Sequence, residues 1–225
     1  MDDNILRQFF SRSFEKAFNE KMLYRNYVFD SISAAQYLTD LLSAPYSNFI
    51  SYMIDNYNVS YLSPEDVLQY SSFDDATTNI CAAIKKHNDE GFKALEIGKF
   101  LEDDGKERKD TAYIKYGENH AKTAESLGLV FNLSNVYFLS CIGYSLDTLS
   151  DKERRELLAR LIIRNRLVQR LIYRSLSEKQ SSFMKETDFL TESTANRRKS
   201  NNRYLFQFIS SIYPDCTAMF SSIIF

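Results

Sequence analysis

The sequence predicts a mainly α-helical protein, and three observations support this fold class. Only six Gly and three Pro interrupt 225 residues, so the chain lacks the many tight turns of an all-β architecture. Hydrophobic residues make up 44% of the chain and charged residues 26%, which is typical of a globular protein rather than a disordered one. The long stretches between turn signals carry apolar residues at helical spacing. We therefore expect helices to dominate.

The first predicted segment, residues 1–75, is a helical N-terminal region. Two of its helices are expected over 32–42 and 47–56, and the first ends before Pro45 because the residue preceding a proline disfavours the helical conformation. The sequence Ser-Pro-Glu-Asp from Ser63 predicts an N-cap and the start of a short helix. An aromatic, apolar stripe opens the segment and consists of Ile5, Leu6, Phe9, Phe10, Phe14, Phe18, Met22 and Leu23.

The second predicted segment, residues 76–149, contains three helices and a β-hairpin. The helices are expected over 77–87, 94–101 and 110–127. Gly128 closes the third helix as a C-cap. The strands of the hairpin are expected over 129–131 and 136–139, on either side of a turn. Three helices followed by a hairpin is the order of a winged helix.

The third predicted segment, residues 150–225, is a long connecting helix followed by a second helix-turn-helix-like module. Ser150 and Glu153 have the spacing of a capping box at the start of the long helix. In the module, a short helix within 183–190, a Ser/Thr-rich turn and a basic helix over 194–211 follow in order. The apolar tail from Cys216 to Phe225 is expected to dock on the core or on a partner.

Basic residues concentrate in this third segment. Residues 151–203 contain 14 Lys and Arg against seven Asp and Glu, a net charge of +7. The whole chain has a net charge of −2, so the residues outside this stretch carry a net charge of −9. Such a split is typical of a surface that meets a polyanion. The alternative is an Arg-rich helix face that is merely solvated.

The basic helix predicts contacts to DNA. Phosphates are bound by Arg, Lys, Ser, Thr, Asn and helix N-termini, and base edges by Arg, Asn and Gln on a helix in the major groove. Between Glu192 and Arg203 almost every residue is of these types, whereas a solvated face would normally include Glu. The predicted contact set is Arg197, Arg198, Lys199, Asn201, Asn202 and Arg203.

Two further groups of basic residues are predicted to support these contacts. Arg166, Arg170 and Arg174 repeat at four-residue spacing on one flank of the long helix, where they would meet phosphates. Lys115 and Lys122 lie on the third helix of the second segment. Glu118 and Glu125 compete with them there, so this helix could instead serve packing or protein contacts.

No catalytic, metal or cofactor site is predicted. The chain has two histidines, of which His120 is expected to be an exposed helical residue, and three cysteines that are too widely spaced for a zinc or Cys/His site. The phosphate-binding patterns GxxxxGK[ST] and GxGxxG are missing. We therefore expect a protein that is not an enzyme and holds no cofactor.

The sequence also predicts a cytoplasmic protein. An odd number of widely spaced cysteines indicates a reducing compartment. The acidic, polar start of the chain is unlike a signal peptide, and no window approaches the roughly 20 apolar residues that span a bilayer.

Several runs resemble a known class of domain. The runs Ala94-Leu-Glu-Ile-Gly-Lys-Phe-Leu101, Tyr116-Gly-Glu-Asn-His-Ala-Lys-Thr-Ala-Glu-Ser-Leu-Gly-Leu-Val130 and Tyr137-Phe-Leu-Ser-Cys-Ile-Gly143 resemble winged-helix domains of prokaryotic DNA-binding proteins. The runs Ser193-Thr-Ala-Asn-Arg-Arg-Lys-Ser200 and Tyr204-Leu-Phe-Gln-Phe-Ile209 are similar to a second module beside such domains in restriction-modification and related defence proteins. The resemblance covers roughly residues 75–212, with Ser140 in place of the usual Thr and no nuclease domain. It implies a recognition or adaptor subunit.

The leading hypothesis is a non-enzymatic DNA-binding subunit of a prokaryotic DNA-targeting complex, from restriction or defence. One alternative is a protein-interaction scaffold that uses winged helices for assembly, and another is a dimeric transcription regulator. A protein partner or a homodimer would use the N-terminal aromatic stripe or the apolar tail.

Overall fold

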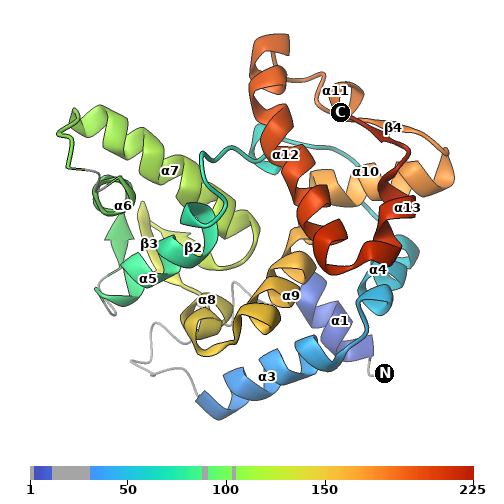
Figure 1. Ribbon diagram of the computed structural model, residues 1–225, viewed down its shortest axis with the longest axis horizontal. Helices are drawn as coiled ribbons and strands as arrows, with labels where there is room; N and C mark the ends of the chain where they lie inside the picture. The colour runs from blue at the N-terminus through green and yellow to red at the C-terminus, as the bar shows by residue number, and fades with distance from the viewer. Residues whose placement is uncertain (1–2, 12–30, 88–90, 103–104) are drawn as a thin grey trace. The chain divides into compact units, whose positions relative to one another are not determined.

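The computed structural model describes residues 3–11, 31–87, 91–102 and 105–225, and most of them lie in helices (Figure 1). The mainly α-helical fold class is confirmed. The chain forms two compact units, residues 1–43 with 70–154 and residues 44–69 with 155–225. Each unit thus combines two stretches of chain, whereas the three predicted segments are consecutive. No helix within the described part of the chain is long and apolar enough to cross a membrane.

Unit 1 contains eight short or medium helices and a small sheet in its described residues, together with the start of a further helix. In chain order they are α1 (Asp3–Phe10), α3 (Ser31–Ser43), η2 (Asp75–Asn79), α5 (Ile80–Lys85), β1 (Phe92–Lys93), α6 (Ala94–Leu101), α7 (Asp110–Ser126), β2 (Val130–Leu133), β3 (Val136–Leu139), α8 (Cys141–Ser145) and η4 (Leu146–Thr148). Helix α9 (Asp151–Ile162) begins in unit 1 and continues into unit 2. Phe14, Phe18, Met22 and Leu23 of the predicted aromatic stripe lie outside the described residues.

Two glycines allow α6 and α7 to cross with their backbones almost in contact. A Cβ atom on Gly98 would stand 1.9 Å from the carbonyl oxygen of Tyr113, and one on Gly117 would stand 1.9 Å from that of Ala94. Both positions therefore require glycine, since any side chain would separate the helices. This close crossing holds α6 and α7 together within unit 1.

The predicted hairpin is present, and it belongs to a three-stranded antiparallel sheet with the order β1-β3-β2. Phe131 lies opposite Phe138 and Leu133 opposite Val136. The two turn residues, Ser134 and Asn135, both have positive φ, as the two-residue turns that suit a hairpin require. The short strand β1 pairs with β3 and was not foreseen from the sequence.

Unit 2 contains helices and one two-stranded sheet. Besides most of α9 they are α4 (Tyr46–Asp55), η1 (Pro64–Asp66), α10 (Arg166–Ser177), β4 (Ser181–Ser182), α11 (Phe183–Glu186), α12 (Glu192–Ile212), η5 (Pro214–Cys216), α13 (Thr217–Phe220) and β5 (Ile223–Ile224). Strands β4 and β5 are parallel. The order α10, β4, α11, α12 repeats the order α5, β1, α6, α7 of unit 1.

The prediction of one long helix after Ser150 was wrong. The capping box at its start is present, because the Ser150 amide donates to Glu153 Oε2 at 2.9 Å and the Glu153 amide donates to Ser150 Oγ at 3.3 Å. The helix stops at Ile162, however, and α10 starts anew at Arg166. Asn165 caps α10 by accepting from the Val168 amide at 3.1 Å, and its own amide group donates to the carbonyl of Asp66 at 3.0 Å. A buried cap with a tertiary partner thus divides the helix.

The apolar tail packs on unit 2 itself. Phe220 and Ile223 are buried, and the ring of Phe225 lies 5.7 Å from that of Phe183 and 5.5 Å from that of Phe206. Ser175 of α10 donates from Oγ to the carbonyl of Met219 at 2.7 Å. Of the two predicted locations, core or partner, the tail takes the core.

Candidate nucleic-acid interface

Helix α12 begins two residues before its predicted start and has two distinct faces. Thr191 caps it, with Oγ1 accepting from the Thr194 amide at 3.3 Å. Its buried face comprises Ala195, Asn202, Leu205, Phe206, Phe208 and Ile209. Its exposed residues are Glu192, Ser193, Asn196, Arg197, Ser200, Arg203, Tyr204, Gln207 and Ser211. No Asp or Glu follows Glu192 anywhere in the helix, so the exposed face is polar and cationic.

Arg198, a predicted DNA contact, holds a loop of its own unit. Its guanidinium donates to the carbonyls of Pro64 at 2.7 Å and Val67 at 2.9 Å, and to the side chain of Gln69 at 3.2 Å. Two effects lower the pKa of this guanidinium: partial burial, which is the larger, and the neighbouring charge of Arg197. With its donors engaged in this way, Arg198 serves the fold and is a poor candidate for a phosphate contact.

Asn202 was wrongly predicted to face DNA. Its side chain is 1% exposed, and it accepts from the Leu68 amide at 3.3 Å and donates to the Leu68 carbonyl at 3.1 Å. The amide group thereby satisfies a buried backbone donor and acceptor in the same loop that Arg198 holds. Together the two side chains fix the inner face of α12.

The three arginines on α10 form an ion-pair network within unit 2. Glu186 is 6% exposed, and its carboxylate lies 3.5 Å from Arg170 and 2.7 Å from Arg174. Arg170 also donates to the Val59 carbonyl at 2.7 Å. Arg166 donates to the Tyr61 carbonyl at 2.7 Å and lies 3.9 Å from the buried carboxylate of Asp66. The four-residue spacing thus aligns these side chains on buried carboxylates and carbonyls.

The remaining predicted contacts of α12 lie at or near its exposed face. Arg197 and Arg203 are exposed, and Lys199 and Asn201 are half-buried. The guanidinium of Arg203 lies 5.6 Å above the ring of Phe225. The sequence-based set missed Asn196, Ser200 and Gln207 on the same face. Ser200 lies three residues from Arg197 and from Arg203, Gln207 lies four residues after Arg203, and Asn196 lies four residues before Ser200, so helical spacing could have revealed them.

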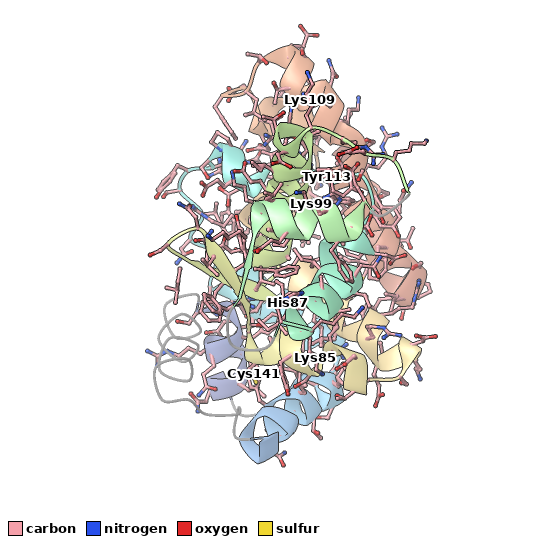
Figure 2. All side chains as sticks on the ribbon, turned by 90° about the vertical axis from the view of Figure 1, so that its left-hand side faces the viewer. Lys85, His87, Lys99, Lys109, Tyr113 and Cys141 are labelled. Atoms are coloured by element: carbon pink, nitrogen blue, oxygen red, sulfur yellow. The ribbon has the colours of Figure 1, made fainter. Side chains whose placement is uncertain are left out.

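In unit 1, Lys115 and Lys122 are exposed on α7, but their face also carries acids. Lys122 lies 3.9 Å from Glu118, and at the start of the helix Lys99 lies 3.1 Å from Asp110. Figure 2 shows Lys99, Tyr113 and Lys109 at this end of the unit. The Tyr113 hydroxyl donates to the carbonyl of Lys106 at 3.0 Å, so the loop before α7 is tied to the helix. The α7 face has balanced charge.

His120 was wrongly predicted to be exposed, because its side chain is 1% exposed within unit 1. Its Nδ1 donates to the carbonyl of Tyr116 at 2.8 Å, which leaves Nε2 to accept from the amide of Ser71 at 3.3 Å. Burial lowers the pKa of His120, although the Tyr116 carbonyl and the carboxylates of Asp75 and Glu102 act in the opposite direction. The neutral imidazole is therefore part of the folded structure.

Acidification from pH 7 to pH 5 should reduce the stability of unit 1 through His120. The unfolded chain takes up a proton near pH 6.5, whereas the folded chain resists protonation until lower pH, so the contribution is complete above about pH 6.5 and is lost below it. One such group changes the free energy of unfolding by at most about 1.4 kcal/mol per pH unit. Urea unfolding of wild type and His120→Gln at several pH values measures this slope. The exposed His87, replaced by Gln, is the control, and an equal slope in all three proteins would contradict the assignment.

Comparison of the chain with protein-family models, with curated proteins and with solved structures returned no significant match. Among the described residues, no three His, Cys, Asp or Glu side chains gather as a metal site would require. The candidate site is the exposed face of α12, which carries cationic and hydrogen-bonding side chains, while Arg198 and Asn202 hold the other side of the helix.

Proposed function

We propose that this protein binds DNA through the exposed face of α12, as a non-enzymatic recognition subunit of a prokaryotic DNA-targeting complex. The observation that carries the proposal is the composition of that face. After Glu192 at its first residue, the face offers Arg, Asn, Ser and Gln side chains with one Tyr, and no further carboxylate. Those are the groups that meet phosphates and base edges in protein–DNA interfaces.

The order of elements supports the same function. Strand β4, the short helix α11, a turn and α12 form a helix-turn-helix layout in which α12 takes the place of the recognition helix. In unit 1, α5, β1, α6, α7 and a hairpin whose second strand pairs with β1 have the order of a winged helix. The runs that resemble restriction and defence proteins coincide with these two modules.

The charge balance separates the roles of the two modules. On α12 the only acid is Glu192 at the first residue, and no acid follows it, whereas on α7 Lys122 has Glu118 3.9 Å away. Acids that close to a phosphate would cost binding energy. We therefore assign DNA to the module of unit 2, and the α7 face to packing or to a protein partner.

Salt dependence of DNA binding tests the proposal. With Arg197, Lys199 and Arg203 on phosphates, log affinity for duplex DNA should fall against log salt with a slope of about −3, at roughly 0.9 per phosphate. Arg197→Ala with Lys199→Ala should reduce the magnitude of this slope by about 2. Fluorescence anisotropy with a labelled duplex of mixed sequence, read over a salt series, gives both numbers.

The matched variant removes the same charge from unit 1, by Lys115→Ala with Lys122→Ala. It should leave the slope of the wild-type protein unchanged. A wild-type slope near zero, or a slope that only the unit 1 variant reduces, would overturn the assignment to α12.

A further inference from the structure

The structure assigns sequence reading to Asn196, Ser200 and Gln207, which form the central line of the α12 face, and phosphate binding to the cations on its two flanks. This inference rests on the proposed function and deepens it. It names the residues that specify a base sequence, and none of them was part of the predicted contact set.

Helical geometry places these residues on one line. At 100° per residue, Ser200 lies 40° around the helix from Asn196, and Gln207 lies between them, two turns further on. All three side chains are exposed. They therefore point in the same direction and can enter the same groove together.

The flanks of this line carry the charge. Arg197 lies on one side of it, and Arg203 with Lys199 lies on the other, by the same rotation of 100° per residue. A helix in the major groove has a phosphate backbone on either side and base edges in front of its central line. Cations on both flanks and neutral side chains between them match that arrangement.

The chemistry of the central line suits base edges. Asn and Gln can pair with the N6 and N7 groups of adenine through two hydrogen bonds, and Ser can donate to or accept from any base. Ser200 is small, so it also lets the helix approach closely. The corresponding line on α7 holds Glu118, Lys122 and Glu125, and carboxylates there would be repelled by the flanking phosphates.

The opposite face of α12 is held firmly. Asn202 is bonded to both backbone groups of Leu68, and Arg198 bonds two carbonyls of the same loop. The helix therefore cannot rotate about its axis without breaking these bonds. Such restraint is what a reading surface needs, because direct readout depends on side chains held within a few tenths of an ångström.

Selection of binding sites from a randomised duplex library by the full-length protein tests the inference. The wild-type protein should enrich a short motif. Asn196→Ala and Gln207→Ala should each lose preference at one position, by about tenfold or more, since a good bidentate pair discriminates by about 1–3 kcal/mol. Arg197→Ala should weaken binding to all sequences alike and leave the motif unchanged. Asn58→Ala, an exposed amide of unit 2 outside α12, is the matched control and should alter neither property.

The outcomes distinguish this inference from the function on which it rests. The wild-type protein could bind DNA with the expected salt slope but enrich no motif, or the motif could survive in Asn196→Ala and Gln207→Ala. Either result would refute sequence reading by the central line and leave the proposal of DNA binding intact. If the wild-type protein does not bind duplex DNA at all, both are overturned.

Discussion

Gly98→Ala is expected to lower the free energy of unfolding by about 3 kcal/mol, the upper end of the cost of overpacking a tightly packed site. Helix propensity alone predicts the opposite sign, since Ala is favoured over Gly in a helix by about 1 kcal/mol. The added methyl group, however, would stand 1.9 Å from the carbonyl oxygen of Tyr113 and 2.6 Å from its carbonyl carbon. Both atoms belong to backbone, which cannot move aside unless α6 and α7 separate. Urea unfolding followed by far-UV circular dichroism measures the change.

Gly105→Ala is the control for this experiment. Gly105 has a positive φ of 74° and nothing within 4 Å of a Cβ atom, so alanine there costs only backbone strain, about 1 kcal/mol. If Gly98→Ala unfolds at the same urea concentration as the wild-type protein or at a higher one, the close crossing of α6 and α7 is refuted.

Local signals in the sequence predicted local structure well. The Ser150–Glu153 capping box is present with both hydrogen bonds, and Ser63 with Asp66 forms another at η1. The hairpin forms around Ser134 and Asn135. Each of these features depends on residues only a few positions apart, so the sequence carries the whole signal.

Features that depend on distant residues could not be predicted in this way. The strands β1, β4 and β5 have two residues each, and a pair such as Ser181 and Ile223 is joined only by the fold. The break before α10 needs Asn165, whose partner is the carbonyl of Asp66. A continuous apolar pattern across the break therefore predicted a single helix.

The candidate interface shows the same division. The position of the basic helix and the absence of acids after Glu192 were readable from the sequence. Which polar side chains of that helix face outward was not readable from the sequence, because Arg198 and Asn202 find their partners in the loop at residues 64–69. The helical repeat would have placed both residues on the side of Ala195 and Leu205, but their polar character suggested exposure.

Glu186→Gln is expected to destabilise unit 2 by about 3 kcal/mol, the lower end of the cost of breaking a buried ion pair. The substitution keeps the shape of the side chain and removes its charge. The carboxylate of Glu186 lies 3.5 Å from Arg170, whose side chain is 14% exposed, and 2.7 Å from Arg174. Both arginines would lose this negatively charged partner. Because Glu186 and Arg170 are largely buried, most of the loss should persist in high salt, which screens buried pairs much less than exposed ones. Thermal and urea unfolding at low and high salt measure both properties.

Glu178→Gln provides the matched control, since Glu178 is exposed and lies 3.7 Å from the same Arg174. A surface pair of this kind contributes about 0–1 kcal/mol, so this variant should unfold almost as the wild-type protein does. The comparison also decides what the α10 arginines do. If they serve phosphates, as the sequence alone indicated, Glu186→Gln should leave stability unchanged and strengthen DNA binding, because it frees two cations. If they hold unit 2 together, the variant loses stability, and Arg170→Met combined with it recovers part of the loss by removing the uncompensated charge.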